Sequence, residues 1–532
     1  MKYEQWIAPE MYNLTSEMER HPADRTALKY LGEDGGLEEI TYGELLKRAN
    51  RLAGGLAGLG LVKGDRVLVM VPRRIAAYVI YLACLKLGLA VIPSSEMLRA
   101  KDLSYRLRHS EARAVIAWSA VAGEVERISD DLPALEFRIA VMADDAQTHP
   151  EGWLELSELE TGRPDTFETV QTHRDDMAIL AYTSGTTGHP KGVVHSHGWA
   201  YAHLRITSPW LDIRPDDLVW ATAAPGWQKW IWSPFLSVLG NGATGFVYSG
   251  SFHPKRYLQL LQDHSVGVLC CTPTEYRIMA KTEGLEGYDL SGLRSAVSAG
   301  EPLNLEVINT FRRCFDITIR DGYGQTESTL LIGNLKDAPF RMGSMGRSIA
   351  EGLVEVVGED GLPLPPGVVG DIAVHLEMPA LFRTYYLDPG RKQKSSHGEY
   401  FITGDRASRD EDGFFWFEGR GDDIIISSGY TIGPFEVEEA LMKHEAVKEC
   451  AAVASPDEIR GHVVKAFVVL KEGTEGTHEL VKSLQDHVKG LTAPYKYPRK
   501  IEFISDLPKT SSGKIRRVEL REAERRAVLG GN

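Results

Sequence analysis

The residues that most clearly indicate chemistry form a glycine-rich and hydroxyl-rich segment between a strand-like stretch and a helix-like one. The segment is Tyr182-Thr-Ser-Gly-Thr-Thr-Gly-His-Pro-Lys-Gly192. Backbone N–H groups and hydroxyls on such a turn approach a ligand closely, and a lysine adds positive charge, so the segment suits a polyphosphate. It is not a Walker A loop, because that motif ends in Gly-Lys-Ser/Thr, whereas Lys191 follows Pro190 and precedes Gly192.

Six further motifs follow in order along the chain. They are Ser298-Ala-Gly-Glu-Pro302, Asp321-Gly-Tyr-Gly-Gln-Thr-Glu327, Thr403-Gly-Asp405, Gly419-Arg-Gly-Asp-Asp423, Ser428-Gly-Tyr430 and Pro508-Lys-Thr-Ser-Ser-Gly-Lys514. In residue types and in order, the motifs resemble those of the adenylate-forming superfamily, which includes acyl-CoA synthetases, peptide-synthetase adenylation domains and firefly luciferase. The resemblance runs over essentially the full chain, so chance agreement is negligible.

The resemblance implies a site for ATP and AMP. Tyr323 offers a flat face for adenine, Thr326 a hydroxyl for the α-phosphate, and Glu327 a carboxylate for the Mg²⁺ that accompanies ATP. Asp405 would bind the ribose hydroxyls with the help of Arg420, although without the resemblance it would be interpreted as a turn cap. The expected nucleotide-binding residues are Thr183, Ser184, Gly185, Thr186, Thr187, Gly188, Lys191, Gly300, Glu301, Pro302, Asp321, Gly322, Tyr323, Gly324, Gln325, Thr326, Asp405 and Arg420.

The family's reaction has two steps. A carboxylate oxygen attacks the α-phosphorus of ATP and pyrophosphate leaves; a thiol then displaces AMP from the acyl-adenylate. Because the first step brings anions together, neutralisation by Mg²⁺ and a lysine must supply much of the acceleration. The resemblance implies that Lys514, Thr326 and Glu327 are catalytic, although Lys514 alone would be interpreted as a solvated cation beside Arg516 and Arg517.

Three segments resemble the medium-chain acyl-CoA synthetases in particular and favour coenzyme A as the acceptor. They are Ser427-Ser-Gly-Tyr430, Ile432-Gly-Pro434 and Tyr495-Lys-Tyr-Pro-Arg499. The implied CoA-binding residues are Ser428, Gly429, Tyr430, Arg460, Tyr497 and Arg499, whose basic members suit phosphates but equally suit a solvated surface. Thr431 departs from the arginine usual in these synthetases, so a phosphate contact there is in doubt. Transfer to a separate carrier protein stays open.

The expected acyl pocket includes Trp227 and Gly324. Acetyl-CoA synthetases close their pocket with a tryptophan where this chain has Gly324, so a longer or branched acid is favoured. Gly226-Trp-Gln-Lys-Trp-Ile-Trp232 supplies apolar walls, although core packing explains Trp230 and Trp232 equally well. Two alternatives remain: an aryl-CoA ligase for a benzoate-like acid, and a nucleotide-binding module without catalysis.

Strand-like and helical segments alternate along the chain, which predicts an α/β fold. We expect a large N-terminal AMP-binding domain over residues 1–421, built of subdomains and including an antiparallel β section beyond Asp360. A small α+β C-terminal domain would follow over residues 422–532. Family members rotate this domain between the two half-reactions, and the residue that matches their hinge is Asp422.

Composition limits the possible partners and compartment. The 532 residues include 74 acidic and 60 basic side chains, a net charge of −14, which argues against nucleic acid as the main partner. We expect no signal peptide, because the first residues lack an apolar core behind a basic stretch, and no apolar stretch is long enough to span a membrane. The five cysteines contain no C-x-x-C spacing and suggest core thiols in a reducing compartment. A cytoplasmic enzyme acting on a carboxylic acid, ATP and CoA is the expectation.

Overall fold

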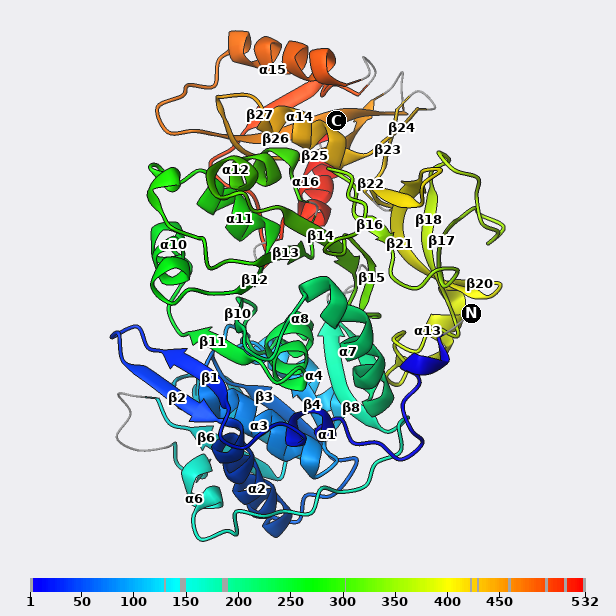
Figure 1. Ribbon diagram of the computed structural model, residues 1–532. Helices are drawn as coiled ribbons and strands as arrows, with labels where there is room; N and C mark the ends of the chain where they lie inside the picture. Colours follow the sequence, from blue (N-terminus) through cyan, green and yellow to red (C-terminus); the bar gives the residue numbers. More distant parts are fainter. Residues whose placement is uncertain are drawn as a thin grey trace. The chain divides into compact units, whose positions relative to one another are not determined.

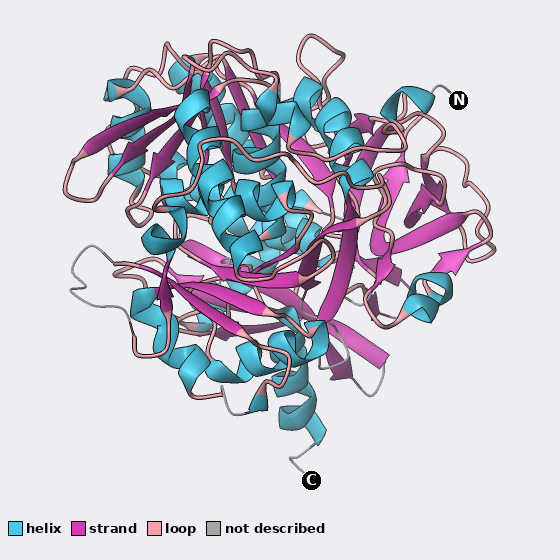
Figure 2. Ribbon diagram, turned by 90° about the horizontal axis from the view of Figure 1, so that it is seen from below, coloured by secondary structure: helices cyan, strands magenta, loops and turns pink. Residues whose placement is uncertain are grey.

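The computed structural model describes residues 3–128, 131–143, 150–183, 190–301, 303–421, 423–427, 430–457, 461–492, 496–510 and 514–529. The chain divides into two compact units. The first comprises Met1–Phe340, Ile349–Leu353 and His375–Ser396, and the second comprises Arg341–Ser348, Val354–Val374 and His397–Asn532. Helices and strands mix throughout both (Figures 1 and 2), which confirms the predicted α/β class with a large and a small unit.

One sheet of the first unit has the strand order β19-β9-β8-β4-β3-β5-β6-β7. Its strands are β3 (Arg66–Met70), β4 (Ala90–Pro93), β5 (Ala114–Trp118), β6 (Phe137–Val141), β7 (Leu154–Glu155), β8 (Met177–Thr183), β9 (Lys191–Ser196) and β19 (Thr384–Tyr385). Neighbours from β8 to β7 are parallel, whereas β9 runs antiparallel to both β8 and β19. The central strands are almost continuously apolar because a parallel sheet is covered on both faces.

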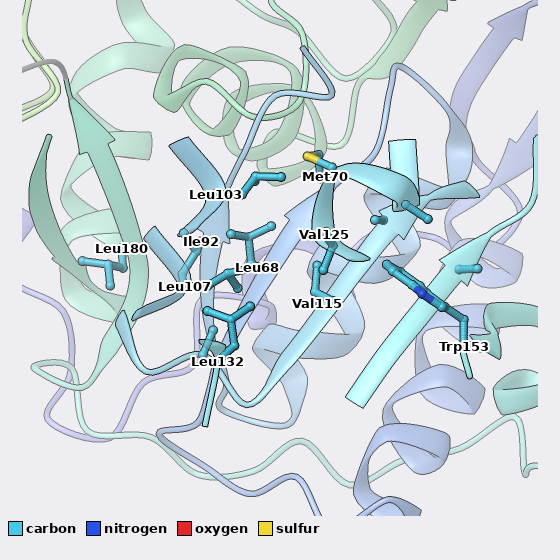
Figure 3. Packing of buried hydrophobic residues seen from close by; sticks show 14 of the residues in the cluster. Leu68, Met70, Ile92, Leu103, Leu107, Val115, Val125, Leu132, Trp153 and Leu180 are labelled. Atoms are coloured by element: carbon cyan, nitrogen blue, oxygen red, sulfur yellow. The ribbon is translucent and has the colours of Figure 1, made fainter. Parts of the chain in front are cut away.

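Helices of the first unit bury this sheet. They include α3 (Ile75–Lys86), α4 (Ala100–Ser110), α5 (Ala122–Glu126) and α6 (Leu156–Glu160). The same part of the chain contains α1 (Ser16–Glu19) and α2 (Tyr42–Gly58), with short turns η1 (Glu4–Trp6) and η2 (Ser119–Val121). Helix α2 begins after Thr41, whose hydroxyl accepts a hydrogen bond from the Glu44 N–H at 3.2 Å. In Figure 3, Leu103 and Leu107 of α4 pack with Leu68, Ile92 and Val115 of the strands, as an i, i+4 pair on one helix face must.

The second sheet of this unit has the order β15-β14-β13-β12-β10-β11-β1-β2. The strands are β1 (Thr26–Leu31), β2 (Leu37–Thr41), β10 (Leu218–Ala221), β11 (Thr244–Tyr248), β12 (Val268–Cys271), β13 (Ser295–Ala299), β14 (Ile319–Gly324) and β15 (Leu330–Gly333). Strands β14 to β1 are parallel, and β15 and β2 are antiparallel to their neighbours. Helix α7 (His197–Leu211) contacts β9 of the first sheet and β13 and β15 of the second, so it lies between the sheets.

The remaining elements of the first unit connect these strands. They are α8 (Gln228–Trp230), the π-helical segment η4 (Ile231–Ser237), α9 (Val238–Gly240), α10 (Pro254–Asp263), α11 (Pro273–Ala280), η5 (Leu285–Gly287), α12 (Leu305–Phe315) and α13 (Pro389–Lys394). All five cysteines are free thiols; four are buried, as predicted, and Cys314 is partly exposed.

The second unit combines an antiparallel β section with an α+β section. The former contains β16 (Gly346–Ser348), β17 (Val354–Val357), β18 (Gly370–His375), β20 (Ser396–His397), β21 (Tyr400–Arg409) and β22 (Phe414–Arg420). The latter contains β23 (Ile425–Ser427), β24 (Tyr430–Ile432), α14 (Pro434–Met442), β25 (Val447–Asp457), β26 (Gly461–Leu470), α15 (His478–Leu491), β27 (Lys500–Phe503) and α16 (Arg517–Leu529). The predicted hinge, Asp422, lies outside the described residues, so the domain boundary there stays a prediction.

No helix in the described part of the chain is long and apolar enough to cross a membrane.

Candidate active site

The predicted phosphate loop connects two antiparallel strands. Thr183 at the end of β8 pairs with Lys191 at the start of β9, so the predicted loop is followed by a strand and not by a helix. Both residues are partly buried. Ser184, Gly185, Thr186, Thr187 and Gly188 lie outside the described residues.

Helix α4 contacts the residues on either side of this loop. The Tyr105 hydroxyl donates to the Pro190 carbonyl at 3.0 Å, and His109 Nδ1 lies 2.8 Å from the Tyr182 hydroxyl. The Arg106 guanidinium lies 5.5 Å from the centre of the Tyr182 ring, and burial lowers the pKa of Arg106 to about 10. These three helix residues were missed from the sequence, because nothing in their spacing says which loop the helix meets.

Tyr385 connects the phosphate-loop lysine with the predicted metal ligand. Strand β19 pairs with β9, which sets Tyr385 opposite Val193. The Lys191 ammonium lies 5.5 Å from the centre of the Tyr385 ring, and the Tyr385 hydroxyl donates to Glu327 Oε1 at 2.9 Å. Burial and the neighbouring Glu327 carboxylate raise the pKa of Tyr385, so its hydroxyl remains a donor. Sequence reasoning missed Tyr385, which lies 58 positions from Glu327.

The adenine motifs meet because β13 and β14 are parallel neighbours. Ser298 pairs with Asp321 and Ala299 with Gly322, so the segments that follow leave the same edge of the sheet. Gly300 has φ +109°, a conformation that favours glycine. Pro302 lies outside the described residues.

Glu301, predicted to bind nucleotide, already has protein partners. Its Oε2 accepts hydrogen bonds from Thr274 at 2.8 Å and from Arg277 at 2.7 Å, both on α11. The ion pair is partly exposed, so its contribution to stability is about 1 kcal/mol or less. Within this unit, the Glu301 side chain anchors the loop to α11.

Asp321 is a buried carboxylic acid at the middle of β14. Its Oδ1 accepts a hydrogen bond from the Gly322 N–H at 2.9 Å, yet burial raises its pKa to about 8. Gly322 itself permits close packing, since a Cβ there would lie 2.6 Å from the Trp210 ring.

The turn from β14 to β15 carries the remaining nucleotide residues. Tyr323, Gln325, Thr326 and Glu327 are all partly exposed. Ser328 closes the turn: its N–H donates to the Gln325 carbonyl at 3.0 Å, and its hydroxyl accepts from the Gln325 N–H at 3.1 Å. The turn therefore holds Thr326 and Glu327 at the end of a strand.

Gly324 is required by the backbone as well as by any pocket. A Cβ at this position would overlap the Thr329 carbonyl oxygen and lie 3.1 Å from the Trp232 ring. Even alanine would force the β14–β15 turn to move, so substitution of Gly324 is a poor test of pocket size.

The three tryptophans of the predicted acyl segment differ in their surroundings. Trp230 is 1% exposed and packs against Tyr78, Tyr81 and Phe235, so it belongs to the core. Trp232 lies beside Gly324, and Trp227 is partly exposed. Lys229, which the sequence did not single out, donates to the Ala299 carbonyl at 2.5 Å and so ties this segment to the end of β13.

The predicted ribose ligands lie together in the second unit. Asp405 of β21 and Arg420 of β22 are register partners in an antiparallel pair, with Oδ1 and Nη1 3.8 Å apart. Asp405 is 8% exposed on its side chain and Arg420 is 46% exposed. The Asp405 N–H donates to the Thr403 hydroxyl, which in turn donates to the Ile372 carbonyl. The carboxylate thus lies in the middle of β21, opposite the last residue of β22.

Lys514 is an exposed residue in a closed turn of the second unit. The Thr510 N–H donates to the Lys514 carbonyl at 2.7 Å, and the Lys514 N–H donates to the Thr510 hydroxyl at 3.1 Å. Helix α16 begins three residues later at Arg517, whose guanidinium bonds the buried Glu438 at 2.6 Å and 3.1 Å. The backbone that carries Lys514 is therefore anchored at both ends of the turn.

Two of the predicted CoA residues contact one another. The Arg499 guanidinium donates to the Tyr497 hydroxyl at 2.7 Å and lies 4.8 Å from its ring centre, while the Lys489 ammonium lies 4.3 Å from that ring. Tyr430 pairs with Ser427 and Thr431 with Ile426 in the β23–β24 hairpin. Ser428, Gly429 and Arg460 lie outside the described residues.

Comparison with protein families finds two matches that together cover most of the chain. A model described as "AMP-binding enzyme" matches residues 14–386, and one described as "AMP-binding enzyme C-terminal domain" matches residues 436–514.

Curated proteins of similar sequence are named as acyl-CoA ligases or synthetases. The uncharacterized acyl–CoA ligase YtcI of Bacillus subtilis (strain 168) is 58% identical over 529 residues, which are 98% of each chain. The mitochondrial acyl-coenzyme A synthetase ACSM3 of Mus musculus is 41% identical over 501 residues, 92% of this chain and 86% of the mouse protein.

Solved structures resemble the whole chain. An anthranilate CoA ligase, AuaEII, in complex with anthranoyl-AMP superposes with a TM-score of 0.90 at 29% identity, covering 99% of this chain and 100% of that one. A benzoate CoA ligase from Burkholderia xenovorans LB400 superposes with a TM-score of 0.84 at 30% identity, covering 96% and 100%.

The buried Asp321 predicts a pH-dependent stability. Its pKa is about 8 in the folded chain against an ordinary value of 3.8, so the folded chain holds this proton more tightly and loses stability as pH rises from about 4 to about 8. The loss is at most about 1.4 kcal/mol per pH unit. The asparagine of the Asp321→Asn variant cannot titrate, so the variant should not lose stability in this way. We therefore expect the unfolding free energy of the variant, relative to that of the wild type, to increase as pH rises from about 4 to about 8, as measured by denaturant unfolding.

The control is Asp316→Asn, which changes an exposed aspartate in a left-handed turn that asparagine also adopts. A difference between Asp321→Asn and the wild type that stays constant from pH 4 to pH 8 would contradict the assignment.

Proposed function

Because this chain belongs to the AMP-binding enzyme family and is an acyl-CoA ligase of the adenylate-forming type, we propose that its substrate is a medium-chain or branched-chain carboxylic acid. The acid is activated by ATP as an acyl-adenylate, and the acyl group then passes to coenzyme A with release of AMP. A separate carrier protein is the alternative acceptor.

The observation that carries the proposed chemistry is the contact of Tyr385 with both Lys191 and Glu327. Tyr385 thus brings a cation and a carboxylate close to one another. Binding of a polyphosphate with Mg²⁺ requires both groups, since the lysine neutralises phosphate and the carboxylate binds the metal. No group of three potential metal-binding side chains occurs among the described residues. A single carboxylate suits Mg²⁺, which takes most of its ligands from phosphate and water.

In the first half-reaction, an oxygen of the substrate carboxylate forms a bond to the α-phosphorus while the bond to pyrophosphate breaks. Lys191 and the phosphate-loop N–H groups bind the departing phosphates, and the Thr326 hydroxyl donates to the α-phosphate. Glu327 would hold Mg²⁺, which supplies charge neutralisation when bound. Asp405, assisted by Arg420, accepts hydrogen bonds from the ribose hydroxyls. The ring of Tyr323 stacks on adenine. Lys514 bridges the substrate carboxylate and the phosphate.

In the second half-reaction, the CoA sulfur attacks the acyl carbon and AMP leaves. Lys514 must withdraw before a thiol enters, so we place a domain boundary at Asp422 and a rotation of residues 422–532 about it. Tyr497 and Arg499, with Arg460, would bind the CoA phosphates. The Ser428-Gly-Tyr430 segment would lie along the pantetheine arm, where glycine allows close approach.

The acid is proposed from the apolar side chains near Gly324. Trp232 beside it and the partly exposed Trp227 offer flat apolar walls, which suit an alkyl chain. An aromatic acid is the second candidate, because flat walls also stack on rings and because two similar solved structures are named as anthranilate and benzoate ligases.

A panel of acids tests the proposed substrate class. Pyrophosphate release would be measured with acetate to decanoate, branched acids and benzoate, each with and without CoA. We expect the largest kcat/KM for a medium or branched acid, with release of AMP that depends on CoA. Highest activity with benzoate would favour the aryl alternative, and pyrophosphate release with none of them would contradict the proposal.

Lys514→Ala separates the half-reactions. We expect adenylate formation to fall by about a hundredfold or more, because a charge made for that transition state is lost. Thioester formation from synthetic acyl-AMP should stay within about threefold of the wild type. The control is Lys482→Ala, which removes an exposed lysine of the same unit. Equal loss of both half-reactions would contradict the role of Lys514.

Tyr385→Phe keeps the ring beside Lys191 and removes only the hydrogen bond to Glu327. We expect KM for Mg·ATP to rise by roughly tenfold, since the loss of a hydrogen bond to a charged group costs about 1.5–3 kcal/mol. KM for the acid should be unchanged. Tyr386→Phe serves as the neighbouring control, and an equal effect of the two substitutions would argue against this role.

A further inference from the structure

His203 is fully buried on α7 and uses both ring nitrogens. Its Nδ1 lies 2.5 Å from the Thr329 hydroxyl, and its Nε2 lies 2.9 Å from the Trp232 carbonyl oxygen. The Thr207 hydroxyl, one turn further along α7, lies 3.1 Å from the Thr329 hydroxyl. Every polar atom in this cluster therefore lies within hydrogen-bond distance of another.

The partners determine the direction of each hydrogen bond. A carbonyl oxygen only accepts, so His203 Nε2 carries the proton and Nδ1 is the acceptor. The Thr329 hydroxyl, the nearer of the two threonine hydroxyls, then donates to Nδ1 and accepts a hydrogen bond from the Thr207 hydroxyl, which itself lies 3.3 Å from Nδ1. Burial lowers the pKa of His203 to about 4, which keeps the ring neutral and this single tautomer in place at neutral pH.

The two ends of the cluster are parts of the candidate active site. Thr329 is the last residue of the turn that carries Thr326 and Glu327. Trp232 belongs to the acyl segment and lies beside Gly324. Trp199 precedes His203 by one helical turn, stacks on its ring with centroids 5.1 Å apart, and donates to the Ser328 carbonyl at 3.1 Å. Helix α7 thus holds two successive residues of the nucleotide turn.

In the acyl segment, His203 forms a hydrogen bond with the backbone of a π-helical turn. Trp232 belongs to η4, a π-helical segment, and such segments are rare and occur frequently at functional sites. The Trp232 carbonyl accepts from the Ser237 hydroxyl at 2.6 Å as well as from His203. These two donors fix the backbone of the residue that would form a wall of the pocket.

We infer that His203 is a positioning residue that couples the acyl-pocket wall to the nucleotide turn, an inference that rests on the proposed function. One rigid ring sets the separation between the Trp232 backbone and Thr329. A change of this ring moves the acid preference and the affinity for nucleotide together, although the ring touches neither ligand.

The test compares His203→Ala with His197→Ala. His197 is also fully buried on α7, but its Nδ1 accepts from the Leu14 N–H at 3.2 Å, away from the site segments. We expect both variants to lose thermal stability. Only His203→Ala should raise KM for ATP by roughly tenfold and change the ratio of kcat/KM for decanoate to that for butyrate by a similar factor, because small displacements of site groups cost 10²-fold or more in rate.

Two more conservative substitutions keep the inference testable if His203→Ala fails to fold. Thr329→Val removes the hydroxyl that donates to Nδ1 and should raise KM for ATP with little change in acid preference. His203→Gln keeps an N–H donor for the Trp232 carbonyl and should restore the acid preference more than the ATP affinity. Calorimetric binding of AMP to the same proteins gives a measure independent of turnover, and we expect His203→Ala to weaken it by roughly tenfold.

Failure of the inference and failure of the proposed function give different results. The positioning role is wrong if His203→Ala binds AMP as the wild type does and keeps its acid ratio, if Thr329→Val binds AMP as the wild type does, or if His197→Ala changes both properties equally. If the wild type activates no acid on the panel, the proposed function is wrong, and AMP binding by the variants still decides the role of His203.

Discussion

The candidate site depends on the parallel register of three neighbouring strands, β12, β13 and β14. Cys271 pairs with Ser298 and Ser298 with Asp321, so three segments far apart in sequence leave one edge of the sheet. Parallel strands place their carboxyl ends at the same edge, and loops at that edge carry the ligand-binding groups of open α/β sheets. Helix α7, which contacts β13 and β15, therefore supports these loops as well as the sheet.

Support for the site comes mainly from aromatic and neutral polar side chains. Tyr105 and His109 hold the phosphate loop, Tyr385 holds Glu327, and His203 with Trp199 holds the turn between β14 and β15. Burial keeps His203 and Tyr385 uncharged, because it lowers the pKa of His203 to about 4 and raises that of Tyr385. Neutral supports position the charged residues without adding charges that would compete for phosphate or metal.

The motifs predicted the nucleotide chemistry better than they predicted its supports. The α/β class was evident from the alternation of strand-like and helical segments, and the composition of residues 182–192 suggested a phosphate loop. The pairing of Asp405 with Arg420 was expected only because their motifs resemble those of a known family. Tyr385 and His203 were not, since their partners lie 58 and 126 positions away and depend on which strands become neighbours. The composition of the tryptophan-rich segment could not separate Trp230, which packs among other aromatic rings, from Trp232, which lies beside Gly324, because both side chains are buried.

Cys270 and Cys271 end β12 at the same edge of the sheet as the adenine motifs, and both are buried. An acyl-adenylate is a mixed carboxylic–phosphoric anhydride that a nearby thiolate would capture. The thiolate, not the thiol, is the nucleophile in such a reaction. Burial raises the pKa of both cysteines, so they persist as unreactive thiols. A ligase that hands its intermediate to the thiol of a cosubstrate is thereby protected from acylating itself, and the low dielectric of its own core provides that chemical selectivity.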